Sequence, residues 1–273
     1  MTLQEKFAQL EQQGGALLAT NFYNYETLAG VLEAAAKSNQ PIILQTSPGT
    51  TSYLGVKMAA SMARAGLEQF GVTGWLHLDH AISYDLIKEC LDAGYDSVMI
   101  DASEDSFEKN VETSAKVVEL AKTYNANVEA ELGYVAKLGQ SLKSDGFTDP
   151  EEARTFVEQT GVNALAVAIG SAHGFYKKEP NLDLGRLRNI HKVTSAALVL
   201  HGGSGIPASQ LQEGIRRGIR KINLATEIKN IFMKTLQREL AETDEIDLRS
   251  IFPEATKKVT ELVQEKLAII SNA

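Results

Sequence analysis

The sequence has little cysteine, no excess of positive charge and no long apolar run. Cys90 is the only cysteine among 273 residues, so an internal disulfide is excluded and nothing indicates an oxidising compartment. The 27 Lys and Arg residues are outnumbered by 35 Asp and Glu residues, for a formal net charge of −8. This balance excludes the broad basic surface typical of nucleic-acid-binding proteins and favours a protein that acts on small molecules.

Membrane and secretion signals are also missing. The segment M-T-L-Q-E-K-F-A-Q-L-E-Q-Q-G-G at residues 1–15 is amphipathic and contains acidic residues, and it lacks the basic start and apolar core of a signal peptide. No apolar run is long enough to cross a bilayer. We therefore expect a cytoplasmic protein with neither a membrane nor a nucleic acid as its partner.

Short apolar runs recur along the whole chain, and segments of helical periodicity separate them. The eight runs are Ala16–Phe22, Pro41–Ser47, Trp75–Ala81, Ser97–Ser103, Asn127–Gly133, Ala164–Gly170, Ala197–Gly203 and Lys221–Glu227. Helices are expected at Glu26–Lys37, at Thr148-Asp149-Pro150-Glu151 and after Pro207. Eight strand–helix units predict an α/β fold, the (β/α)₈ TIM barrel, which takes about 250 residues.

A doubly wound open sheet is the alternative fold, but the sequence has no G-x-G-x-x-G turn after an early strand. No linker divides the chain, so we expect a single domain over residues 1–273. The segment Thr256–Ile270 is an extra amphipathic C-terminal helix. Its apolar face must pack on the barrel or on a second subunit, and the size of that face favours a homo-oligomer.

Polar residues gather at the C-terminal ends of the predicted strands, where barrels of this kind carry their chemistry. These residues are Asn21, Ser47, Asp79, His80, Asp101, Ser103, Glu131, His173, His201, Asn223 and Thr226. One such residue alone would be explained by a hydrogen bond to a turn. So many at one rim indicate a functional site.

Three histidines, His80, His173 and His201, follow different strands, as an open catalytic Zn²⁺ site requires. Asp101 and Glu131, on intervening strands, could fix the tautomer of a ligand histidine or bind metal in another position. The other two histidines are expected to have structural roles. His77 should lie in a layer inside the barrel, hydrogen-bonded to a neighbour, and His191 should lie at the surface after a helix. Cys90 should be a packed helix residue.

Glycine-rich loops indicate a second function. H-G-G-S-G follows the seventh strand and N-L-A-T-E lies at the eighth, where these barrels commonly bind phosphate. No lysine suited to form a Schiff base lies inside a predicted strand. Lys221 is expected to begin the eighth strand, at the opposite end from the site, which argues against a covalent aldolase mechanism.

Motifs along nearly the whole chain resemble the class II, metal-dependent ketose-bisphosphate aldolases, the fructose- and tagatose-bisphosphate aldolase family. These motifs are N-F-Y-N-Y-E-T-L, Q-T-S-P-G, H-L-D-H-A, A-G-Y-D-S-V-M-I-D-A-S, V-E-A-E-L-G, T-D-P-E-E-A, A-V-A-I-G-S-A-H-G-F-Y, L-V-L-H-G-G-S-G-I and K-I-N-L-A-T-E. The resemblance implies zinc-dependent cleavage of a ketose phosphate to dihydroxyacetone phosphate and an aldehyde, in a homodimer or homotetramer.

The resemblance also implies a role for each matching residue. His80, His173 and His201 match the zinc ligands, and Asp79 matches the acid/base at the C4 hydroxyl. Glu131 matches a further metal-binding position, with Asp101 close by. Asn21 and Ser47 match residues that touch the ketose or its enediolate. Gly174, Gly202, Ser204, Asn223 and Thr226 match a phosphate cradle that often holds a monovalent cation, Na⁺ or K⁺.

The chain departs from the family in the loop after E-L-G, which usually carries a Glu-Asp pair. No glutamate lies between Tyr134 and Thr148, and Asp145 is the only acid there. Either Asp145 or a water replaces the proton donor, or the substrate is unusual, or catalysis is slow. The basic Lys137 and Lys143 either meet an anionic substrate or are simply solvated.

With Ala225, the motif N-L-A-T-E resembles that of the tagatose-bisphosphate branch. One residue does not identify the sugar, so we predict only that the substrate is a ketose phosphate. Two other functions remain open. One is a catalytically weak or dead homologue that binds sugar phosphates. The other is a different zinc-dependent hydrolase on the same fold, which the motif order disfavours.

Overall fold

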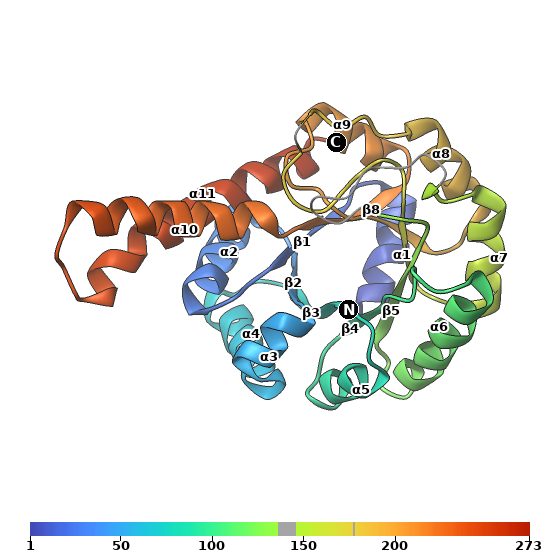
Figure 1. Ribbon diagram of the computed structural model, residues 1–273, viewed down its shortest axis with the longest axis horizontal. Helices are drawn as coiled ribbons and strands as arrows, with labels where there is room; N and C mark the ends of the chain where they lie inside the picture. The colour runs from blue at the N-terminus through green and yellow to red at the C-terminus, as the bar shows by residue number, and fades with distance from the viewer. Residues whose placement is uncertain (136–145, 177) are drawn as a thin grey trace.

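The computed structural model describes residues 1–135, 146–176 and 178–273. Within these residues, eight parallel strands close into a barrel in chain order (Figure 1). The strands are β1 Leu17–Asn21, β2 Ile42–Thr46, β3 Gly74–Ala81, β4 Ser97–Ile100, β5 Asn127–Leu132, β6 Ala164–Val167, β7 Ala197–Leu200 and β8 Ile219–Leu224. Each overlaps one predicted run, so the (β/α)₈ barrel is confirmed and the open sheet is excluded.

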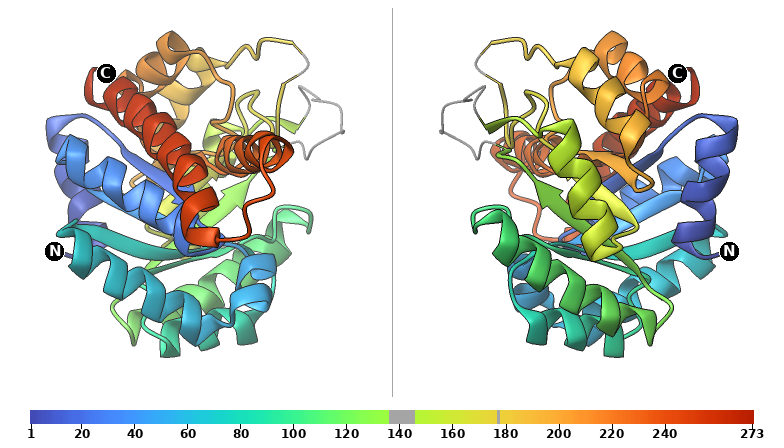
Figure 2. Two further views of the ribbon diagram at one scale, coloured as in Figure 1. Left: turned by 90° about the vertical axis from the view of Figure 1, so that its left-hand side faces the viewer. Right: turned by 90° about the vertical axis from the view of Figure 1, so that its right-hand side faces the viewer.

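Helices cover the barrel from the outside (Figure 2). They are α1 Leu3–Gln13, α2 Tyr25–Ser38, α3 Pro48–Leu54, α4 Val56–Phe70, α5 Tyr84–Asp92, α6 Phe107–Lys122, α7 Pro150–Thr160, α8 Leu184–Val193, α9 Ala208–Arg216, α10 Thr226–Glu242 and α11 Leu248–Ser271. The predicted start of α7 is confirmed, because Asp149 accepts hydrogen bonds from the backbone N–H groups of Glu151 and Glu152.

Side chains alternate between the two faces of each strand. Outward residues such as Leu18, Ile42 and Leu76 join the core between the strands and the helices. Inward residues near the strand starts, among them Ile43 and Trp75, form a separate apolar cluster with Leu3, Phe7 and Leu10 of α1. Helix α1 therefore covers the N-terminal mouth of the barrel and leaves the C-terminal end for the polar residues.

Helix α11 begins at Leu248, earlier than the predicted Thr256, and packs along α2 within the same chain. The approach is close, because a Cβ on Gly30 of α2 would lie 2.8 Å from the carbonyl oxygen of Thr256 and 2.9 Å from Val259. Most of the predicted apolar face is thus buried inside the chain, and the size of that face gives no reason for a second subunit.

Helices α10 and α11 also extend together beyond the barrel as an arm (Figure 1). Exposed apolar side chains occur along this arm and the turn that joins its helices: Met233, Leu240, Ile246 and Leu248. No helix in the described part of the chain combines the length and the apolar content needed to span a membrane.

Two further expectations need correction. Strand β8 begins at Ile219, so Lys221 is its third residue and its side chain is fully buried inside the barrel. The prediction that Lys221 begins the strand was wrong, because Ile219 and Arg220 also belong to β8, and Arg220 is buried and paired with Glu11 of α1. His191 lies within α8 and is only partly exposed.

Candidate metal centre

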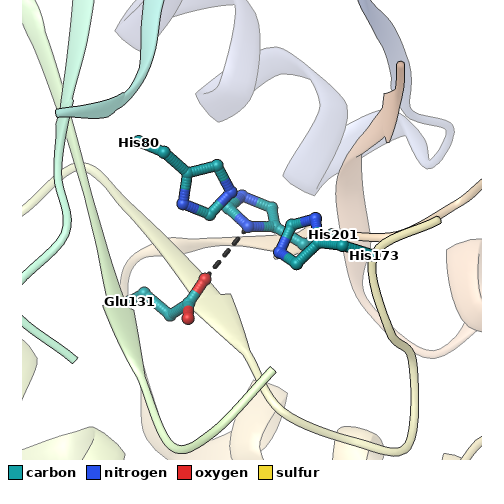
Figure 3. Close-up of side chains that lie close together, drawn as sticks. All are labelled: His80, Glu131, His173 and His201. Carbon is teal, nitrogen blue, oxygen red and sulfur yellow. Dashed lines mark ion pairs between the residues drawn. The ribbon is translucent and has the colours of Figure 1, made fainter. Parts of the chain in front are cut away.

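Four side chains converge at the C-terminal end of the barrel, as Figure 3 shows. His80, Glu131, His173 and His201 each offer a ligand atom, and these atoms all lie within 4.8 Å of one another. They come from β3, from β5, from the segment after β6 and from the first position after β7. The imidazole rings meet edge to face, with the centroids of His80 and His201 4.6 Å apart.

Three buried atoms in this group have no hydrogen-bond partner among the described residues: Nε2 of His80, Nδ1 of His201 and Oε2 of Glu131. Buried polar atoms are nearly always satisfied, so each calls for an explanation. Nδ1 of His201 and Oε2 of Glu131 are 3.0 Å apart, yet they do not form an aligned hydrogen bond. Potential ligand atoms that face one point in this way fit a shared cation, and a set of imidazoles with a carboxylate suits Zn²⁺.

His80 is held by the carboxylate of Asp101. Its Nδ1 lies 2.8 Å from Oδ2 of Asp101, which leaves Nε2 as the atom that faces the group. Oδ1 of Asp101 accepts a hydrogen bond of 2.7 Å from Ser103, whose hydroxyl also lies 3.2 Å from Oε1 of Glu131. Asp101 therefore lies behind His80, and the structure places it outside the converging set.

The backbone at His80 is strained. Its φ of 52° lies in the left-handed region, which costs a non-glycine residue about 1–3 kcal/mol. The pairing of β3 with β4 shifts register between Leu78 and Ala81. Adjacent residues of a regular strand point to opposite faces of the sheet. At this irregularity the side chains of both Asp79 and His80 can lie at the C-terminal end of the barrel.

His201 lies between two glutamates. Its Nε2 is 2.8 Å from Oε1 of Glu129, and its Nδ1 faces Glu131. Burial lowers the pKa of His201, but its interactions with Glu129 and Glu131 outweigh burial and raise the pKa to about 10. A metal that binds Nδ1 must therefore displace a proton. Burial lowers the pKa of His173 to about 3, so this imidazole is neutral and ready to act as a ligand.

Asp79 lies next to the converging set and is buried. Its Oδ2 accepts a hydrogen bond of 3.3 Å from Asn21, and its Oδ1 accepts one of 3.2 Å from Asn223. Gln45 in turn donates to Asn21 at 3.2 Å. Burial raises the pKa of Asp79, but the charge of His80 and of the other basic groups nearby outweighs burial and holds the pKa below its ordinary value.

The predicted phosphate-binding residues lie in the segments after β6 and β7, near the end of β8 and at the start of α10. Gly202 has a φ of 67°, and a Cβ there would lie 2.2 Å from the carbonyl oxygen of Ala172, so the two loops touch. Gly174 directly follows His173 and also has a positive φ, of 95°. Ser204 is buried, and its hydroxyl accepts a hydrogen bond of 3.4 Å from the N–H of Glu227.

Thr226 is the first residue of α10, a helix whose N-terminus has no side-chain cap. N–H groups in the first turn of a helix attract anions, and in α10 the N–H of Glu227 already donates to Ser204. Ser47 lies at the end of β2 as expected, and there its hydroxyl caps α3 by accepting from the N–H of Thr50 at 3.3 Å. Asp145, Lys137 and Lys143 lie outside the described residues.

Sequence reasoning missed two residues beside the centre. Glu129 bonds to His201, and its position was predictable because it lies two residues before Glu131 on the same face of β5. Tyr176 was also missed, and no comparable spacing in the sequence indicates its position. Its hydroxyl donates to the carbonyl oxygen of Gly202 and accepts from the N–H of Ala172, both at 2.8 Å, and so fastens together the two touching loops.

Comparison with known proteins gives one consistent result. The family model "Fructose-bisphosphate aldolase class-II" matches residues 1–273. A Bacillus subtilis (strain 168) protein named "Probable fructose-bisphosphate aldolase" is 39% identical over 273 residues, which span 98% of this chain and 96% of that protein.

Solved structures agree with the family match. The crystal structure of the YdjI aldolase from Escherichia coli K12 has a TM-score of 0.86 at 29% identity, covering 99% of this chain and 96% of that one. The fructose-bisphosphate aldolase of Campylobacter jejuni shares the fold, with a TM-score of 0.83 at 22% identity over 98% of this chain and 94% of that one.

Proposed function

Because the chain belongs to the class II fructose-bisphosphate aldolase family, we propose that it reversibly cleaves a ketose phosphate or bisphosphate to dihydroxyacetone phosphate and an aldehyde. The observation that carries this proposal is the convergence of three histidines and Glu131 beside a buried aspartate, Asp79. A metal centre next to a proton acceptor suits cleavage of a β-hydroxy ketone. The bond that breaks joins the carbon beside the carbonyl to the carbon that bears the hydroxyl group.

Zn²⁺ is the metal we propose, with His80, His173 and His201 as ligands and Glu131 as a further one. The unpartnered atoms of His80 and His201 support this assignment. When bound, zinc would supply a Lewis acid that polarises the substrate carbonyl and stabilises the enediolate. Asp101 contributes by holding the ring of His80.

Asp79 is the acid/base in this proposal. Its lowered pKa keeps it ionised at neutral pH, so it can accept the proton of the C4 hydroxyl during cleavage and return it during condensation. Asn21 and Asn223 fix both carboxylate oxygens by donating to them, and this leaves the remaining lone pairs of Asp79 to accept the proton.

The phosphate group of the substrate would occupy the loops after β6, β7 and β8. Gly174, Gly202, Ser204, Asn223 and Thr226 form the proposed cradle, and the N-terminus of α10, where Ala225 provides no side-chain cap, supports it. The close contact of Gly202 with Ala172 leaves no room for a side chain at this position of the cradle. A monovalent cation, Na⁺ or K⁺, belongs to the same proposal.

We further propose a homodimer or homotetramer in the cytoplasm. The α10–α11 arm supports oligomerisation, because it extends from the barrel and exposes Met233 and Leu240. Light scattering at micromolar concentration should give a multiple of the chain mass. A monomer mass would contradict the proposed assembly.

A second candidate function rests on the loop that lacks glutamate between Tyr134 and Thr148. A homologue that binds zinc and dihydroxyacetone phosphate but cleaves slowly or not at all would need no acid in this loop. An atypical ketose phosphate as substrate would explain the same departure.

The test is a panel of ketose 1-phosphates and 1,6-bisphosphates, assayed with and without a chelator. We expect release of dihydroxyacetone phosphate that a chelator abolishes and borohydride leaves unchanged, since no imine forms. His201→Ala should lose both zinc and activity, and normal zinc content in that variant would remove His201 from the ligand set. Zinc and phosphate binding with no cleavage of any member of the panel would favour the second candidate.

A further inference from the structure

A network of fully buried polar side chains lies one layer beneath the metal centre, and the proposed chemistry does not use it. Glu129 and Lys221 form an ion pair with their charged atoms 2.6 Å apart, and their side chains are 1% and 0% exposed. Nζ of Lys221 also lies 3.3 Å from Nε2 of His77. Nδ1 of His77 lies 2.7 Å from the hydroxyl of Ser97, to which Asn127 donates at 2.9 Å.

The network contacts the metal centre through the hydrogen bond of 2.8 Å between Oε1 of Glu129 and Nε2 of His201. An ionised carboxylate can only accept, so Nε2 of His201 must carry the proton of this bond. Its other nitrogen, Nδ1, is the atom without a partner that faces Glu131. Glu129 therefore determines which nitrogen of His201 is available as a ligand.

His80 shows the same arrangement with its nitrogens exchanged. Asp101 occupies Nδ1 of His80, and the unpartnered atom is Nε2. Two of the three ligand histidines thus have a carboxylate on the nitrogen that points away from the centre. Such partners fix the orientation and the tautomer of metal-binding histidines.

Lys221 accounts for the stability of this contact. A carboxylate buried without a counter-charge would cost several kcal/mol. Lys221 provides that charge from β8, and Nζ of Lys221 also bonds to Nε2 of His77, which holds the ammonium group at a second point. Because Ser97 and Asn127 hold His77 in turn, this chain of contacts supports Glu129 where it faces His201.

We propose that Glu129 is a positioning residue that selects the tautomer of His201 with Nδ1 free for the metal, and that Lys221 anchors Glu129 in that position. This inference rests on the proposed metal centre and deepens it. It concerns metal affinity, so it can be tested without a known sugar substrate.

Two double variants isolate the hydrogen bond. Glu129→Gln/Lys221→Met and Glu129→Met/Lys221→Met both remove one positive and one negative charge from the interior, and only the first keeps an acceptor for His201. Zinc affinity is measured by competition with a fluorescent chelator. We expect the variant without the acceptor to bind zinc about 10–100-fold more weakly than the variant with it. Equal affinities would overturn the proposal.

Arg220→Met is the matched control for loss of a buried cation. Arg220 precedes Lys221 in β8, is buried, and pairs with Glu11 away from the metal centre. This variant should lower thermal stability and leave zinc affinity unchanged. A loss of affinity as large as that of the acceptor-free double variant would mean that any weakening of the barrel loosens the metal, which would overturn the specific role of Glu129.

A measurement on the unsubstituted protein keeps the inference testable if the double variants do not fold. The ¹⁵N NMR spectrum of zinc-loaded protein with labelled histidine should show His201 protonated at Nε2 and ligated through Nδ1. A proton on Nδ1 would overturn the proposal. Failure of the unsubstituted protein to bind zinc at all would instead refute the proposed function, so the two failures are distinguishable.

Discussion

Asp79→Asn tests the proposed chemistry sharply, because it removes a charge and keeps the size of the side chain. Asn21 and Asn223 each donate to one oxygen of Asp79. In the Asp79→Asn variant one of these oxygens becomes an NH₂ group, which would face the NH₂ group of Asn21 or Asn223. The oxygen of Asn21 already accepts from Gln45, whereas Oδ1 of Asn223 has no partner among the described residues. Rotation of the Asn223 amide therefore relieves the conflict.

The expected magnitudes separate folding from catalysis. One rearranged hydrogen bond costs about 1 kcal/mol. That cost lowers the Tm of a chain of this size by about 2–4 °C. Loss of a positioned acid/base lowers the rate by about 10²–10⁴, or roughly 3–5 kcal/mol in activation free energy. The effect on cleavage should therefore be several times larger in free energy than the effect on stability.

The assay measures kcat for release of dihydroxyacetone phosphate, together with zinc content and Tm. Asp96→Asn is the matched control. Asp96 immediately precedes β4, at the opposite end of the barrel, and accepts from the N–H of Leu76 and from Arg64. The control should keep its kcat. Full activity of Asp79→Asn would refute the acid/base assignment and leave Asp79 as a group that only orients its neighbours.

Three further predictions follow from the same geometry. Tyr176→Phe removes the bridge between Ala172 and Gly202 and should raise the KM for the phosphorylated substrate about tenfold, with kcat nearly unchanged; an unaltered KM would argue against the bridge. Gly202→Ala should abolish phosphate binding in calorimetry, since its Cβ would lie 2.2 Å from a carbonyl oxygen; wild-type binding would contradict the contact. Burial raises the pKa of Cys90 to about 12, so thiolate is scarce at pH 8 and a thiol reagent should react only after unfolding, whereas rapid labelling of the native protein would contradict this.

The barrel and the convergence of three histidines were predictable because each depends on local sequence. Strands of four to eight residues stand out as apolar runs, and in a parallel barrel their ends meet at one rim. His80 lies near the end of such a run and His173 and His201 follow two others, so the topology brings them to one rim. Asp101 was placed at the rim, but its contact behind His80 depends on side-chain direction.

The buried network was not predictable in the same way. Glu129 and Lys221 are a pair only because the closed barrel brings β5 and β8 across its interior from each other, and no sequence spacing encodes that approach. Counting every second residue back from Glu131 and Asn223 would have shown that both side chains point inward. It would not have shown that they meet.

The corrected position of Lys221 also changes the argument against a covalent mechanism. An imine requires a neutral amine that the substrate carbonyl can reach. Lys221 lies one layer beneath Asn223 on the same face of β8, fully buried, and donates to both Glu129 and His77. The carbonyl could reach it only by displacing the layer that holds Asp79, and the amine would then leave Glu129 as an uncompensated buried charge. A lysine inside the barrel is therefore compatible with the metal-dependent chemistry proposed here, because its charge is committed to the carboxylate that orients His201.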